Sequence, residues 1–196
     1  MQRSIPMPKV FHEILGRAQT PADLMVIAAA AIGLGVAIGI AGGETLAAVP
    51  LWRAVLAGLL IVDIAAGCVA NFTPGTDQHY ATRPISRWVF IAVHWHLVAI
   101  GALLGVAVVP LLLVTVYVLL SAAVVNLLHG SRSQVGIGGA LMAIGIVGVV
   151  IWMPASAPLF LVATAALFVV KVVFAFGVAH HGVPEKATTA PRGVRA

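Results

Sequence analysis

Six apolar runs divide the chain, and short polar or proline-containing stretches separate them. Each run is about 18–22 residues long, enough for an α-helix to cross a hydrocarbon core of about 30 Å. The predicted helices cover residues 23–41, 51–72, 87–108, 110–128, 136–153 and 158–179. The pattern predicts an all-α fold: a polytopic integral membrane protein with a bundle of about six transmembrane helices.

The third and fourth runs meet at Val109 and Pro110, which predicts a tight antiparallel hairpin between them. Five helices would result if the two runs formed a single kinked segment. A segment of about 40 apolar residues is too long for one span, however, so six is the preferred number.

The ends of the chain have a different pattern. Val10, Phe11, Ile14 and Leu15 recur at helical spacing with charged residues between them, which predicts a cytoplasmic amphipathic surface helix within residues 1–22. Residues 23–181 then form the six-helix transmembrane domain. Residues 182–196 are polar and proline-containing, which predicts a disordered cytoplasmic tail.

Basic residues are distributed very unevenly between the two sides of the predicted bundle. Nine fall on the side of the N-terminus and one, Arg53, falls on the other. The nine are Arg3, Lys9, Arg17, Arg83, Arg87, Arg132, Lys186, Arg192 and Arg195. Because lysine and arginine accumulate in cytoplasmic loops, the protein is expected to have N-in/C-in topology in a bacterial-type inner membrane.

The composition agrees with a lipid-facing surface, because 61% of the residues are hydrophobic and only 9% are charged. The formal net charge is +5, but the basic residues form no continuous stripe, so we expect membrane lipids and not nucleic acid as partners. The single cysteine excludes an intrachain disulfide. Small residues spaced by four, among them Gly35 and Gly39, mark a helix face that packs within the bundle or against a second copy of the chain.

Two opposite charges fall at matching depth in the predicted bundle. Asp63 lies about 12 residues, or roughly 18 Å, from the outer end of the second helix, and Lys171 lies at nearly the same depth in the sixth. A lone charge near the bilayer centre costs roughly 2.5–3.5 kcal/mol on insertion scales. We therefore predict an intramembrane ion pair. It would act as a proton relay or substrate counter-ion, or as a structural clamp between the two helices.

Two further residues extend this candidate site toward the cytoplasm. Asn71 shares a helix face with Asp63, since the two are eight residues apart. His94 shares a face with Arg87 and two glycines of the third helix, whereas His96 is expected on a less polar face. Two residues apart on one helix means about 200° of rotation, so His94 and His96 are not expected to bind the same metal ion.

Polar side chains gather on the predicted cytoplasmic face, whereas the outer loops are poor in them. The cytoplasmic cluster comprises Asp77, His79, Tyr80, Arg83, Arg87, Asn126 and His129. No metal site is predicted, because cysteine pairs and clustered histidines are absent from the sequence. No cofactor is predicted either. The one alternative considered is a haem held by His94 with His129 or His180.

These patterns favour transport of a small solute or proton through a midplane polar site, with Asp63 and Lys171 at its centre and His94 and Asn71 on the access path. Two alternatives stay open. A membrane-embedded enzyme would act on a lipid-like substrate at the cytoplasmic interface, with Asp77, His79 and Arg83 as headgroup ligands and His94 or His129 as base. A non-catalytic accessory subunit would carry no chemistry of its own.

Overall fold

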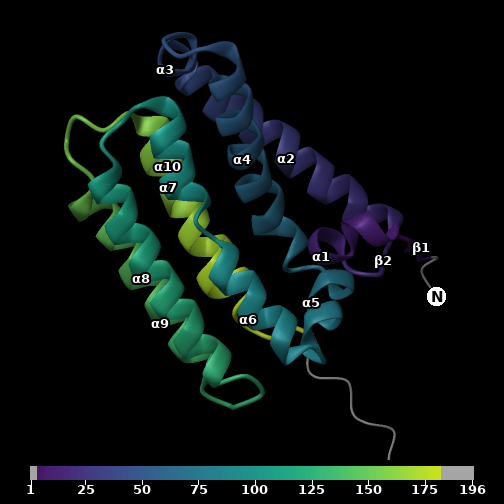
Figure 1. Ribbon diagram of the computed structural model, residues 1–196. Coiled ribbons are helices and arrows are strands. Elements are labelled where there is room, and N and C mark those ends of the chain that lie inside the picture. Colours follow the sequence, from purple (N-terminus) through teal and green to yellow (C-terminus); the bar gives the residue numbers. More distant parts are fainter. Residues whose placement is uncertain (1–3, 182–196) are drawn as a thin grey trace, which may run out of the picture.

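The computed structural model describes residues 4–181 as a bundle of long helices (Figure 1). Its long helices are α2 (Pro21–Ala41), α4 (Leu51–Ala70), α8 (Val108–Leu127) and α9 (Gln134–Trp152). The segment Pro84–Leu104 is also long and apolar enough to cross a membrane, which makes five such helical segments within the described residues. The all-helical, membrane-compatible fold class expected from the sequence is thus confirmed.

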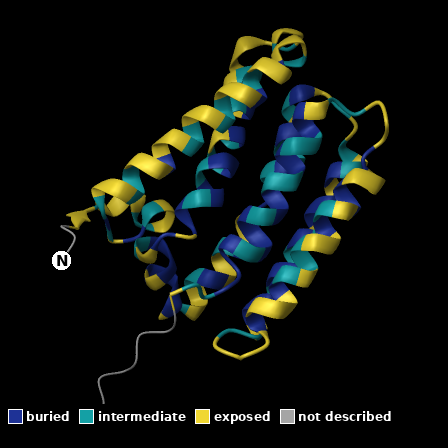
Figure 2. Ribbon diagram, turned by 180° about the vertical axis from the view of Figure 1, so that it is seen from behind, coloured by how far each residue is buried: buried dark blue, intermediate teal, exposed yellow. Residues whose placement is uncertain are grey.

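A further apolar segment, Leu159–Ala175, is shorter than these five and occupies the centre of the bundle. It consists of α10 (Leu159–Val169) followed by η2, a π-helix over Val170–Ala175. It contacts α4, α8 and α9, and its side chains Phe160 and Phe168 are almost completely buried. Helix α2 packs mainly on α4 and buries only two residues, so it lies at the outside of the bundle (Figure 2).

The N-terminal segment differs from the predicted amphipathic surface helix. Strand β1 (Ile5–Pro6) pairs with strand β2 (Ala18–Gln19), and only short helical turns, η1 (Lys9–Phe11) and α1 (His12–Leu15), lie between them. A longer helix is excluded because Gly16, at φ 71°, ends α1 with its backbone against Gly75, where no side chain has room. We call residues 4–19 the N-terminal strap. The predicted tail, residues 182–196, lies outside the described residues.

The region between the second and third predicted helices also differs from expectation. Where a loop was expected, the structure has the short helix α5 (Pro74–Ala81). The third predicted helix, 87–108, begins earlier and is two helices, α6 (Pro84–Val93) and α7 (His96–Leu104). The chain then turns at residues 105–107, where Gly105 has φ 68°, so the predicted hairpin position at Val109 and Pro110 is wrong.

Pro110 lies in the first turn of α8, where a proline's missing N–H removes no helical hydrogen bond. At the same end of the bundle, the single turn α3 (Gly43–Ala47) connects α2 to α4 (Figure 1). The glycine face of α2 is partly used inside the chain, because a Cβ at Gly35 would lie 3.1 Å from Val62 of α4. Gly39 has no such neighbour within 4 Å.

Candidate functional site

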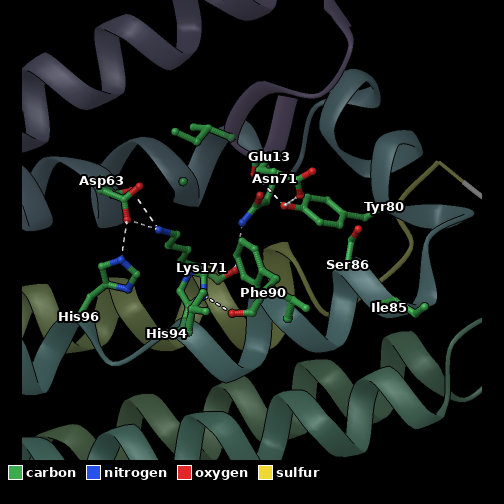
Figure 3. Close-up of a pocket in the computed structure, with 14 residues that line it drawn as sticks. Glu13, Asp63, Asn71, Tyr80, Ile85, Ser86, Phe90, His94, His96 and Lys171 are labelled. Atoms are coloured by element: carbon green, nitrogen blue, oxygen red, sulfur yellow. Dashed lines mark hydrogen bonds and ion pairs between the residues drawn. The ribbon is translucent and has the colours of Figure 1, made fainter. Parts of the chain in front are cut away.

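An ion pair joins α4 to the π-helix η2 in the interior of the bundle (Figure 3). The ammonium of Lys171 donates to the Oδ2 atom of Asp63 at 2.5 Å and to the backbone oxygen of the same residue at 3.2 Å. The side chain of Lys171 is only 4% exposed, whereas that of Asp63 is 34% exposed. The contact predicted from matching depth is therefore present in the structure.

His96 is the third member of this cluster. Its Nε2 atom lies 3.7 Å from the same Oδ2 atom of Asp63. The prediction that His96 lies on a less polar face assumed one continuous helix through His94, Trp95 and His96. The helix breaks at that point, so the two imidazoles come together, with ring centroids 4.8 Å apart.

The break between α6 and α7 is stabilised by the side chains that flank it. A helix break leaves backbone carbonyls without their usual amide donors, which is costly in a membrane. His94 Nδ1 donates to the carbonyl of Phe90, and Trp95 Nε1 donates to the carbonyl of Ala92 at 2.9 Å. With Nδ1 carrying the proton, Nε2 of His94 has a free lone pair.

The second irregular segment is η2, which carries Lys171. The amide of Phe176 donates to the carbonyl of Lys171 at 3.0 Å, an i to i+5 bond that widens the helix. Asn71 lies next to this turn, with its Nδ2 atom 3.5 Å from the Lys171 carbonyl. On α4, Gly67 leaves the space that the lysine crosses, because a Cβ there would lie 2.9 Å from Nζ.

These residues line a cavity of about 460 Å³ between α4, α6 and η2. Asp63, Gly67 and Asn71 form the α4 side, and Ile85, Val89 and Val93 form the α6 side. His94, His96 and Lys171 lie between the two sides, and Glu13, Ile14 and Tyr80 close the end near the N-terminal strap (Figure 3). The four residues that the sequence predicts for the midplane site, Asp63, Asn71, His94 and Lys171, all line this one cavity.

Beyond the ion pair, toward Arg53, the bundle is tightly packed. Ala57 and Ile61 of α4 and Ile100 and Leu104 of α7 are each at most 4% exposed. Beyond them, Arg53 of α4 donates to the carbonyl of Ala102 at 2.5 Å. This packing separates the ion pair from the far side of the bundle.

The cluster expected on the cytoplasmic face divides into separate groups. Arg87 is buried and donates to Asn126 Oδ1 at 2.6 Å and to the carbonyl of Gly177 at 2.9 Å, so it joins α6, α8 and the chain after η2. Asp77 accepts from the backbone amides of His180 and His181. The polar atoms of Arg87, Asn126 and Asp77 are thus engaged in hydrogen bonds within the chain.

His129 likewise bonds to a backbone carbonyl, that of Ala81, at 3.3 Å. Of the predicted headgroup ligands Asp77, His79 and Arg83, only His79 and Arg83 are in direct side-chain contact, with Arg83 Nη1 3.0 Å from His79 Nδ1 and 2.7 Å from its Nε2.

The N-terminal strap is attached to this group through Glu13, which the sequence did not single out. Tyr80 donates to the Glu13 carbonyl at 2.7 Å and to its carboxylate at 3.0 Å, and His79 Nε2 donates to Oε1 at 3.3 Å. Burial lowers the pKa of His79, and the charge on Arg83 lowers it further, while the bond to Glu13 opposes them. Burial and the adjacent Glu13 raise the pKa of Tyr80. Both shifts favour the neutral imidazole of His79 and the neutral phenol of Tyr80.

No group of three or more histidine, cysteine, aspartate or glutamate side chains in residues 4–181 is arranged to hold a metal ion. For haem, neither His129 nor His180 lines the cavity that His94 lines, and His180 Nε2 lies 3.1 Å from the carbonyls of Phe174 and Ala175.

Comparison with protein-family models, with curated proteins and with solved structures yields no match for the chain. The functional interpretation therefore rests on the geometry of the cavity and its ion pair. The five long apolar helices are compatible with an integral membrane protein.

Proposed function

We propose that this protein crosses the membrane six times, with both ends in the cytoplasm, and moves a small solute or a proton through a site in the middle of the membrane. The site comprises Asp63, Lys171, His94 and Asn71, and His96 is added to it. The sixth span is the shorter segment Leu159–Ala175. The basic residues support this orientation. Arg17 lies in the strap, Arg83 between α5 and α6, and Arg132 between α8 and α9, whereas Arg53 lies in the first turn of α4, next to α3 at the far end (Figure 1).

The observation that carries the proposal is the sharing of one carboxylate oxygen. Oδ2 of Asp63 lies 2.5 Å from Lys171 Nζ and 3.7 Å from His96 Nε2. A proton taken up by Asp63 neutralises the carboxylate and releases the lysine, so one protonation event changes the attraction between α4 and η2. Ionisable groups at this depth are costly and characteristically mark ion pathways and proton relays.

The irregular backbone around the pair supports movement at the same place. The break between α6 and α7 adjoins His96, and the π-helical turn begins beside Lys171. Non-helical backbone at membrane depth is tolerated where it is buried or lines a cavity, and interrupted helices form the substrate sites of many transporters. Protonation of Asp63 would thus act on two segments that already depart from regular helix.

The packing at one end of the cavity supports a state that is closed toward the side of the bundle that carries Arg53. The cavity extends from Asp63 toward Tyr80 and Glu13, while Ala57, Ile61, Ile100 and Leu104 are packed between the pair and the far end of the bundle. Transport in this arrangement requires α4 and α7 to separate at those four side chains. Helix movements of this kind are the basis of alternating access.

Proton flux into liposomes containing the purified protein tests the proposal. An imposed potential should acidify an enclosed pH dye faster than in empty liposomes, and Asp63→Asn should reduce the rate to the empty-liposome value. Asp23→Asn is the matched control, because Asp23 caps the start of α2 and lies outside the cavity. Wild-type flux equal to that of empty liposomes, or equal loss in both variants, would contradict a proton pathway through Asp63.

A further inference from the structure

Building on the proposed function, we propose that the molecule entering the cavity is an amphiphile dissolved in the membrane, with an uncharged hydrogen-bonding head and an apolar tail, and that it enters sideways from the lipid. The cavity would place the head at the ion pair and the tail along α6.

The two long sides of the cavity have opposite character. On α4, Asp63, Gly67 and Asn71 follow one another at four-residue intervals and present a polar, narrow wall. On α6, the apolar residues Ile85, Val89 and Val93 follow the same spacing. Each stripe spans eight residues, or about 12 Å of helix, so the cavity is an elongated cleft that is polar on one side and apolar on the other.

The apolar side is also the open side. Val89 and Val93 line the cleft, yet they are 54% and 59% exposed on the outside of the bundle. At this level the surroundings of a membrane-spanning helix are hydrocarbon, not water. A ligand that reaches the cleft between these residues therefore arrives through the lipid, and its tail finds an apolar surface at the entrance.

The polar side has unmet hydrogen-bonding capacity. Oδ1 of Asp63 and Nε2 of His94 have no hydrogen-bond partner among the described residues, and both are acceptors. The hydroxyl of Ser86 and a third N–H of Lys171 add donors along the same cleft. The Asp63 carboxylate lines the cleft and is one-third exposed there, and a polar group facing an apolar cleft without a partner is unfavourable, so a donor from the ligand would stabilise the site.

The charge balance selects an uncharged head. The charges of Asp63 and Lys171 compensate each other at 2.5 Å, which leaves no free countercharge for a phosphate or an ammonium. At the strap end, the carboxylate of Glu13 further disfavours an anion. A hydroxyl or carbonyl head can both donate and accept, and it fits the mixed set of groups without adding charge.

Photo-crosslinking tests this inference directly. The probe is a twelve-carbon alcohol with a diazirine beside its hydroxyl, added to the purified protein in phosphatidylcholine nanodiscs, and the crosslinked residues are identified by mass spectrometry. We expect crosslinks concentrated on residues 63–71 and 85–94. Dodecan-1-ol should compete at least about tenfold better than dodecane, the factor expected for one hydrogen bond to a charged group such as the Asp63 carboxylate.

Competitors and variants sharpen the result. Dodecyl phosphate and dodecyltrimethylammonium should compete no better than dodecane. Val89→Trp narrows the lateral entrance and should suppress the crosslinks, whereas Val116→Trp, a matched lipid-facing position on α8 outside the cleft, should not. Crosslinks spread evenly over all lipid-facing helices, equal competition by dodecane or a charged amphiphile, or full labelling of Val89→Trp would each overturn the inference.

The outcome is separable from that of the flux assay. Absence of proton flux together with alcohol-specific crosslinks would remove the transport step and leave the binding site. Proton flux with no crosslinks in the cleft would retain the relay and remove the amphiphile.

Discussion

Removal of the charges at the Asp63–Lys171 pair, singly and together, tests the central contact of the structure. Asp63→Asn leaves the ammonium of Lys171, which is 4% exposed, without its carboxylate. Breaking one side of such a buried pair costs about 3–5 kcal/mol of folding free energy. Lys171→Met leaves a carboxylate that is 34% exposed and still has His96 at 3.7 Å, so a smaller cost of about 1–3 kcal/mol is expected.

The double variant should lose much less folding free energy than the sum of the losses of the two single variants. An asparagine and a methionine leave no uncompensated charge, and neutral replacements of a buried pair are often tolerated. The resulting coupling energy should be about 2–3 kcal/mol, near the upper end for residues in contact.

Reversible unfolding in mixed micelles with increasing dodecyl sulfate, followed by tryptophan fluorescence, gives the four free energies of this cycle. A control cycle combines Lys171→Met with Asp23→Asn at the start of α2, where additivity within about 0.5 kcal/mol is expected. A coupling energy below about 0.5 kcal/mol for the Asp63 cycle would refute a stabilising ion pair and the reasoning built on it.

Three further outcomes follow from individual contacts. Gly67→Ala should destabilise the fold by about 1–3 kcal/mol because its methyl group displaces the lysine of the pair, whereas Gly58→Ala on the same helix has open space and should be neutral or stabilising in the same unfolding assay. Trp95→Phe removes the donor to a carbonyl at the helix break and should cost about 1 kcal/mol more than Trp88→Phe, which loses no such bond. Because burial lowers the pKa of His79, the unfolded chain binds a proton on this residue more readily than the folded chain does. The contribution of His79 to the free energy of unfolding is therefore complete above a pH of about 6.5 and declines as the pH falls below that value. Hydrogen-exchange protection of the N-terminal strap should decrease as the pH is lowered below about 6.5, and His79→Gln should flatten this dependence. A pH profile of protection that His79→Gln leaves unchanged would exclude His79 as its cause.

The amino-acid sequence by itself determined the class of the fold and the depth of the pair. Long apolar runs require helices in a membrane because every backbone polar group must be satisfied within the segment. Matching depth predicted that Asp63 meets Lys171, since one charge at that level requires a partner. Thr20 and Asp23 hydrogen-bond reciprocally at the start of α2, two residues before the predicted start at residue 23.

Only the tertiary structure decided where helices depart from regularity. The sequence around His94 and His96 has no proline or glycine to signal a break, and ring N–H groups take over the freed carbonyls only in the folded chain. For this reason His96 was assigned to the wrong face and its position beside Asp63 was missed. Glu13 was missed for a similar reason, because its partners Tyr80 and His79 are more than sixty residues away along the chain. Periodicity reports local geometry, whereas these contacts depend on how separate segments pack against one another.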